Sequence, residues 1–123
     1  MAASFFDAFT PVEIAQITAA GRRVTLPQGW SPIWELTGAD KAYILLSGTV
    51  SVRRHGEEIA QLGPGDIMGE AAIVRHSLRT ASVVALTPLE LIHLTSEAVR
   101  RLSDELPSFR AALDQLVLER APQ

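Results

Sequence analysis

An acid and a base stand nine residues apart in GEAAIVRHSLRTAS, the stretch from Gly69 to Ser82. Glu70 precedes a small apolar run, and Arg79 opens the β-type run that follows. Burying a carboxylate is costly unless the carboxylate accepts hydrogen bonds. Because a carboxylate only accepts and a guanidinium only donates, the pair predicts a ligand with donors near Glu70 and negative oxygens near Arg79.

The residues between the pair favour a phosphate as the negative group. A short helix starting at Gly69 would present backbone N–H groups and the positive end of its dipole. Gly69 permits a close backbone approach, and Ala71 and Ala72 keep the side chains small. The donors beside a phosphate in a nucleotide are ribose hydroxyls, so we expect Glu70 to bind these. Glu70 alone is also typical of a helix start, where the helix dipole stabilises a negative charge. Arg79 alone is also typical of an exposed strand end. Only the spacing of the two residues together favours a binding site.

The longer stretch GDIMGEAAIVRHSLRTASVVALTPLELIHL resembles the phosphate-binding cassette and following strands of cyclic nucleotide-binding domains. KAYILLSGTVSVRR resembles the central strands of that family. The resemblance implies that Gly69 and Glu70 hold the ribose hydroxyl and that the N–H groups of Ala71 and Ala72 bind the cyclic phosphate. It further implies that Arg79 neutralises this phosphate.

Two further cassette positions, Thr80 and Ala81, follow the arginine as in the family. A hydroxyl at Thr80 could reach the phosphate or a purine edge, which keeps cGMP open beside cAMP, the ligand we expect first. Two residues depart from the family pattern, since Leu78 replaces a proline and Met68 an aromatic residue. Neither change removes a ligand contact, so we expect weaker preorganisation rather than loss of binding.

The family resemblance also implies that the last helix covers the base. The candidates for this lid are Leu113, Leu116, Val117 and Arg120. The same apolar stripe equally suits a core contact or a homodimer contact through the C-terminal helix.

The composition narrows the class of protein. The 123 residues include no cysteine, and the net charge is −3 with eleven Lys and Arg residues scattered singly or in pairs. Scattered basic residues argue against a nucleic-acid surface. No window reaches the length of a membrane span and the first residues do not form a signal peptide, so we expect a cytoplasmic protein.

The chain reads as a single domain, residues 1–123, that is mainly β with flanking helices. Residues 1–21 form a helical segment, in which Thr10, Pro11 and Glu13 are typical of a helix start and Gly21 of its end. Short β-type runs over residues 22–94 predict an eight-stranded, jelly-roll-like barrel (a double-stranded β-helix) that contains the cassette, residues 69–82. Residues 95–123 predict two C-terminal helices.

Together these features predict a stand-alone cyclic nucleotide sensor that relays occupancy through its C-terminal helices to an effector protein. Because the given sequence leaves no room for a helix-turn-helix after the last predicted helix, we expect one of three arrangements: the signal passes to a separate partner, the chain buffers the nucleotide, or the chain is part of a longer protein. The alternative is a degenerate barrel, used for protein interaction, in which Glu70 and Arg79 pair with each other. An enzyme is not expected, because no catalytic triad or carboxylate pair is recognisable. Neither a cofactor nor a metal site is expected, since His55, His76 and His93 share no spacing.

Overall fold

The computed structural model describes residues 5–33, 40–70, 73 and 81–119. The N-terminal part consists of a 3-10 turn, η1 (Phe5–Ala8), and helix α1 (Pro11–Ala20). The predicted capping box of α1 is confirmed: the Glu13 backbone N–H donates to Thr10 Oγ1 at 3.2 Å, and the Thr10 N–H donates to Glu13 Oε1 at 3.0 Å. This local exchange satisfies two N–H groups that a helix start otherwise leaves unpaired.

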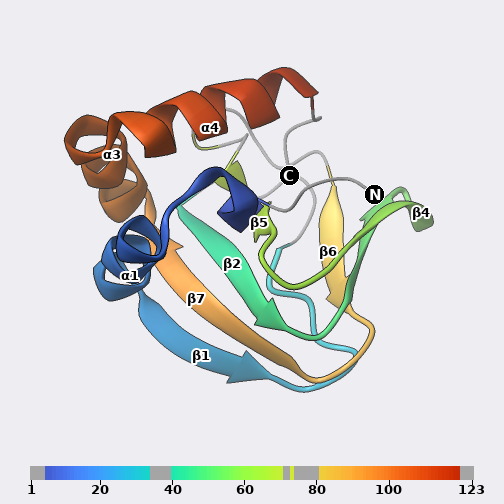
Figure 1. The fold of residues 1–123 in the computed structure, drawn as a ribbon. Coiled ribbons are helices and arrows are strands. Elements are labelled where there is room, and N and C mark those ends of the chain that lie inside the picture. Colours follow the sequence, from blue (N-terminus) through green and yellow to red (C-terminus); the bar gives the residue numbers. More distant parts are fainter. Residues whose placement is uncertain (1–4, 34–39, 71–72, 74–80, 120–123) are drawn as a thin grey trace.

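Seven strands are described, and all their pairings are antiparallel. They form a four-stranded sheet in the order β1-β7-β2-β5 and a three-stranded sheet in the order β4-β3-β6 (Figure 1). The strands are β1 (Arg22–Leu26), β2 (Lys41–Ser47), β3 (Val50–Arg54), β4 (Glu57–Leu62), β5 (Ile67–Met68), β6 (Ser82–Ala85) and β7 (Leu89–Thr95).

The predicted class, mainly β with an N-terminal helix and two C-terminal helices, is confirmed. Within the described residues the two sheets are not closed into a barrel. Of the β-type run SPIWEL, residues 31–36, the structure describes only the first three residues, and Ile33 bridges to Val83.

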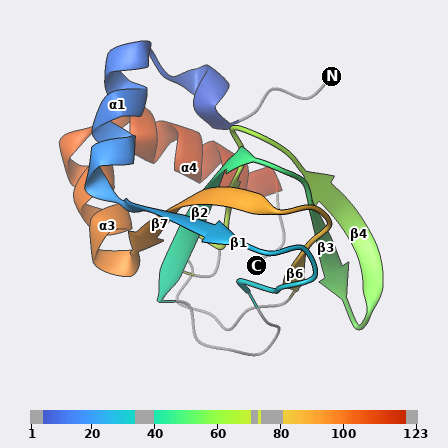
Figure 2. The same ribbon diagram turned by 90° about the horizontal axis from the view of Figure 1, so that it is seen from below.

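The four-stranded sheet separates two apolar cores, because side chains alternate between its faces. On β2, Ala42 and Ile44 face the helices, whereas Tyr43 and Leu45 face the three-stranded sheet. Figure 2 shows α1 and α3 on one side of β1, β2 and β7, with β3 and β4 on the other. We call these two clusters the helix-side core and the inter-sheet core.

The C-terminal helices are α3 (Ser96–Glu105) and α4 (Pro107–Glu119). Thr95 caps α3, its hydroxyl accepting from the Ala98 N–H at 3.0 Å. Phe109 of α4 packs edge-on against Phe5 and stacked on Phe9, with ring centroids 5.7 and 6.3 Å away. These aromatic contacts join α4 to the N-terminal turn η1.

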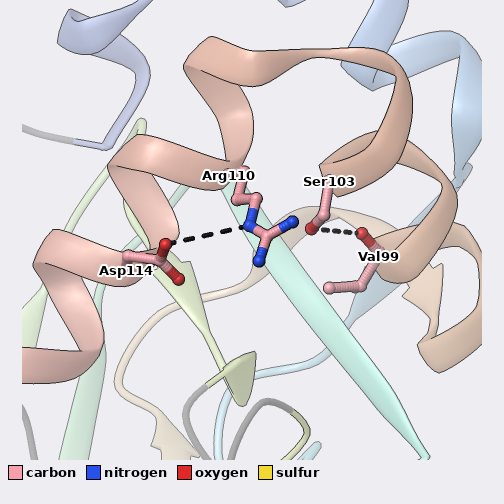
Figure 3. Close-up of polar contacts among 4 residues, drawn as sticks. All are labelled: Val99, Ser103, Arg110 and Asp114. Carbon is pink, nitrogen blue, oxygen red and sulfur yellow. Dashed lines mark hydrogen bonds and ion pairs between the residues drawn. The ribbon is translucent and has the colours of Figure 1, made fainter.

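Each of these two helices has a local polar contact between residues four positions apart. Arg110 and Asp114 form an ion pair at 4.0 Å along α4, and the Ser103 hydroxyl donates to the Val99 carbonyl on α3 at 2.8 Å (Figure 3). Exposed i,i+4 pairs of this kind contribute little to stability. Within the described residues, no helix combines the length and apolar character needed to cross a membrane.

Candidate functional site

Glu70 is fully buried, with none of its surface exposed to solvent. It is the one charged residue in the described part of the chain that belongs to the buried set. A carboxylate is kept in such a position only where hydrogen-bond donors face it, because its desolvation is otherwise uncompensated. Its burial agrees with the prediction of an acceptor that faces inward rather than into solvent.

The backbone immediately before Glu70 makes a turn that requires glycine. Gly69 has a φ of +88°, in the left-handed region that side chains with a Cβ rarely adopt. Glu70 and Ile73 are both helical, in line with the short helix expected here. The chain therefore passes from β5 into a helical segment through one strained position that only glycine occupies at low cost.

Strand β5 fixes the start of the cassette against the centre of the four-stranded sheet. Met68 pairs with Tyr43 and Ile67 pairs with Ile44, both on β2. Ile67 and Met68 are fully buried. Because Met68 belongs to the inter-sheet core, the chain enters the cassette from the space between the sheets.

Strand β6 fixes the other end of the cassette. Ala81 is fully buried and also belongs to the inter-sheet core. Strand β6 then pairs with β3 through Val83 with Val52 and Ser82 with Arg53. Between the two ends, Ile73 lies in the helix-side core, so the cassette contacts both apolar clusters.

Sequence reasoning missed an aromatic pair beside this entry point. Tyr43 and His93 are cross-strand neighbours, with ring centroids 5.4 Å apart and an edge-on angle of 70°. Burial lowers the pKa of His93, and the nearby charges of Arg22 and Lys41 lower it further. The pair lies at the level of Met68, and the only signal for it was the tyrosine within the apolar run AYILL.

No group of three or more metal-ligating side chains occurs in the part of the chain that the structure describes. A cleft of about 480 Å³ lies between α1 and α3, lined by residues that include Gln16, Ala20, Arg101 and Glu105. Among the residues that the structure describes, none of the predicted site residues lines it.

A family model for the cyclic nucleotide-binding domain matches residues 23–105, which is well over half of the chain. The matched range includes Gly69, Glu70 and Arg79. The chain belongs to the cyclic nucleotide-binding domain family.

Relatives of this cyclic nucleotide-binding domain include bacterial regulators. It is 31% identical over 120 residues to the cyclic AMP receptor protein of Thermus thermophilus, covering 94% of this chain and 56% of that protein. It is 26% identical over 123 residues to the CRP-like cAMP-activated global transcriptional regulator of Mycobacterium tuberculosis, covering 96% of this chain and 55% of that protein. The chain thus spans about half the length of these relatives.

The fold agrees with the same family. The crystal structure of the Thermus thermophilus catabolite activator protein superposes with a TM-score of 0.84 and 29% identity, over 94% of this chain and 57% of that one. This likeness supports the predicted jelly-roll-like architecture of the domain.

The structure places some predicted site residues and leaves others undescribed. Gly69, Glu70 and Ala81 are all buried where the cassette meets the sheets. Four cassette predictions (Ala71, Ala72, Arg79 and Thr80) and the lid candidate Arg120 lie outside the described residues.

The described lid candidates are packed into the protein. Leu113 is 2% exposed and Leu116 is partly buried, and both belong to or pack against the helix-side core. Val117 is 8% exposed. Their role as a lid stays a prediction.

Proposed function

We propose that this domain is a regulatory module that binds a purine 3′,5′-cyclic monophosphate. In this proposal Glu70 accepts from the ribose 2′-hydroxyl, and the N–H groups of Ala71 and Ala72 hold the cyclic phosphate. Arg79 supplies the positive charge and Thr80 a further hydroxyl. The observation that carries the proposal is the full burial of Glu70 directly after the left-handed Gly69.

The family supports a cyclic nucleotide but leaves the base to be chosen. The names of the two regulators above refer to cAMP, so cAMP is the first nucleotide to titrate. The hydroxyl of Thr80 keeps cGMP as the second candidate. The proposed role is binding rather than catalysis, and it needs neither a metal nor a cofactor.

The packing of the helix-side core suggests how binding of the nucleotide would be transmitted to a partner protein. Ile73 of the cassette lies in the same helix-side core as Phe109 and Leu113 of α4. A ligand that moves the cassette would therefore shift the packing beneath α4 and bias its position. The outputs that we propose are an effector protein or a homodimer formed through the C-terminal helix, where Leu118 is 81% exposed.

Isothermal titration with cAMP and with cGMP tests the proposal directly. The wild-type domain should bind at least one nucleotide with a Kd of about micromolar, which corresponds to roughly −8 kcal/mol. Arg79→Ala should weaken that binding by about thirtyfold or more, because a phosphate loses its charged partner. Arg110→Ala, which removes an exposed arginine on α4, is the matched control and should leave the Kd unchanged.

Two results would overturn the proposal. Absence of heat with both nucleotides would favour the alternative, a degenerate module that retains the fold for protein interaction. An unchanged titration of the Arg79→Ala variant would show that any binding occurs elsewhere.

A further inference from the structure

Helix α3 carries its charged residues in two blocks on its exposed face. After Glu97 in the first turn, a basic pair is followed by an acidic pair: Arg100, Arg101, Asp104 and Glu105. All five of these residues are exposed to solvent. The opposite side of the helix is held in the helix-side core by Ala98, Val99 and Leu102, which are buried. The charged face of α3 therefore points away from the protein.

The order of the two blocks is unfavourable within α3 itself. The C-terminal end of a helix carries a partial negative charge, which favours basic residues there and disfavours acidic ones. Helix α3 ends in Asp104 and Glu105 and has no basic residue in its last turn. A base placed four residues before an acid is also the weaker orientation for an ion pair along one helix. The stability of α3 alone therefore does not explain the order of these charges.

The two blocks have no partner in the part of the chain that the structure describes. None of their four side chains forms an ion pair or a hydrogen bond there. Arg110 and Asp114 of α4 have the same order and spacing, yet they do form an ion pair, at 4.0 Å. The charges of α3 are therefore open to a second molecule.

The cleft of about 480 Å³ between α1 and α3 adjoins these charges, because Arg101 and Glu105 are among its lining residues. Its apolar lining includes Ala19 of α1 and also Leu102 and Leu106. Ala19 is small and exposed, so a second surface can approach α1 closely. Long charged side chains can cover apolar surface with their stems while their charged ends stay in water. In both Figure 1 and Figure 2, α1 and α3 lie side by side on the side of the molecule away from β4.

We infer that a second copy of this chain packs on this surface, with the two α3 helices antiparallel about a two-fold axis. The axis passes near the middle of the sequence RRLSDE, which begins at Arg100. Arg100 then lies opposite Glu105 of the second copy. Arg101 lies opposite Asp104 of the second copy. A two-fold axis repeats each contact, so both basic blocks meet acidic blocks, whereas a parallel arrangement would bring like charges together.

This interface is separate from the exposed Leu118 of α4 and does not depend on the proposed binding of a nucleotide. Exposed ion pairs are individually weak and are screened by salt. The dimer should therefore be weak and should dissociate as the salt concentration rises.

Sedimentation equilibrium of charge-reversed proteins tests the inference. The acidic variant carries Arg100→Glu and Arg101→Glu, and the basic variant carries Asp104→Arg and Glu105→Arg. The wild-type dimer should have a Kd that rises by about tenfold or more between about 50 mM and about 1 M NaCl. At the lower salt concentration each variant alone should also raise the Kd by about tenfold or more, because like charges then face each other. An equimolar mixture of the two variants should associate again, because their facing blocks are once more opposite in sign.

Two control variants accompany these proteins, and a circular dichroism melting curve checks the folding of each. Arg110→Glu reverses an exposed arginine on α4 and should leave the Kd of the dimer unchanged. Leu118→Ala removes the exposed leucine of α4 and should also leave it unchanged.

Three results would overturn the inference. The first is a wild type that stays monomeric at about 1 mM protein and low salt. The second is a mixture of the two variants that associates no better than either variant alone. The third is a dimer that Leu118→Ala disrupts and the charge reversals do not, which would place the contact on α4. The titrations with cAMP and cGMP test the proposed function independently of all three.

Discussion

The carboxylate of Glu13 on α1 accepts a hydrogen bond from the hydroxyl of Ser108 at the start of α4, 95 residues along the chain. The same carboxylate accepts from the Thr10 backbone N–H and so closes the capping box of α1. One side chain therefore connects the start of the N-terminal helix to the start of the last helix. Hydrogen bonds from Ser108 and from the Thr10 backbone lower the pKa of Glu13.

This link predicts a pH-dependent contribution to stability. A carboxyl group whose pKa is lower in the folded protein stabilises the fold above its ordinary pKa of 4.5, and the effect is lost as the pH falls through the lowered value. Glu13→Gln should therefore lower Tm near pH 7, and the difference from wild type should shrink toward about pH 3. Thermal melts across this range measure it, with Glu119→Gln at the end of α4 as a control. A constant difference across the range would contradict the assignment.

The proposed ribose contact predicts a dependence on the 2′-hydroxyl. Glu70→Gln keeps the shape of the side chain but removes its charge, so binding of cAMP should weaken by about tenfold or more. Binding of 2′-deoxy-cAMP should already be weak in the wild type and should change by less than about threefold in the variant. Equal losses for both ligands would mean that Glu70 supports the fold of the cassette without contacting the ribose.

The packing of α4 predicts which of its leucines stabilise the empty domain. Leu113 is 2% exposed, whereas Leu118 is 81% exposed on the same helix. Leu113→Ala should lower the free energy of unfolding by about 2–5 kcal/mol. Leu118→Ala should change it by no more than about 0.5 kcal/mol. Urea unfolding without nucleotide distinguishes the two, and an unchanged midpoint for Leu113→Ala would assign this residue to ligand contact alone.

His93 predicts a second pH effect, near neutrality. Burial lowers its pKa below the ordinary 6.5, and the charges of Arg22 and Lys41 act in the same direction while Asp40 opposes them. The unfolded chain then takes up a proton at a higher pH than the folded domain, so stability should fall as the pH drops below about 6.5. NMR titration of the imidazole ring measures the midpoint, and His93→Gln assigns the signal and should remove this part of the pH dependence. A midpoint at or above 6.5 would refute the prediction.

Much of the fold could be predicted because the signals were local. Thr10, Pro11 and Glu13 marked the start of α1 by capping chemistry that involves only neighbouring residues. The run AYILL is apolar at successive positions, a pattern typical of a strand covered on both faces, and β2 is a central strand between two cores. The burial of Glu70 also agrees with the expectation that its carboxylate does not face bulk water.

The remainder depends on contacts that sequence periodicity does not contain. The apolar stripe of α4 predicted a buried face but not whether core, lid or partner covers it, and the structure packs Leu113 into the helix-side core. The partnership of Glu13 with Ser108 joins the two ends of the chain and has no local signal. The pairing of Val52 with Val83 likewise joins strands that are distant in the sequence and has no local signal.

The alternation of side chains along β2 and β7 has a thermodynamic consequence. Neighbouring residues of each strand belong to different cores, such as Ile92 and Leu91 on β7. A register shift of either strand by one residue would move the side chains of both cores to the opposite faces of the sheet. The helices and the three-stranded sheet therefore pack against opposite faces of the same four-stranded sheet. The domain should unfold in a single calorimetric transition, with equal van't Hoff and calorimetric enthalpies.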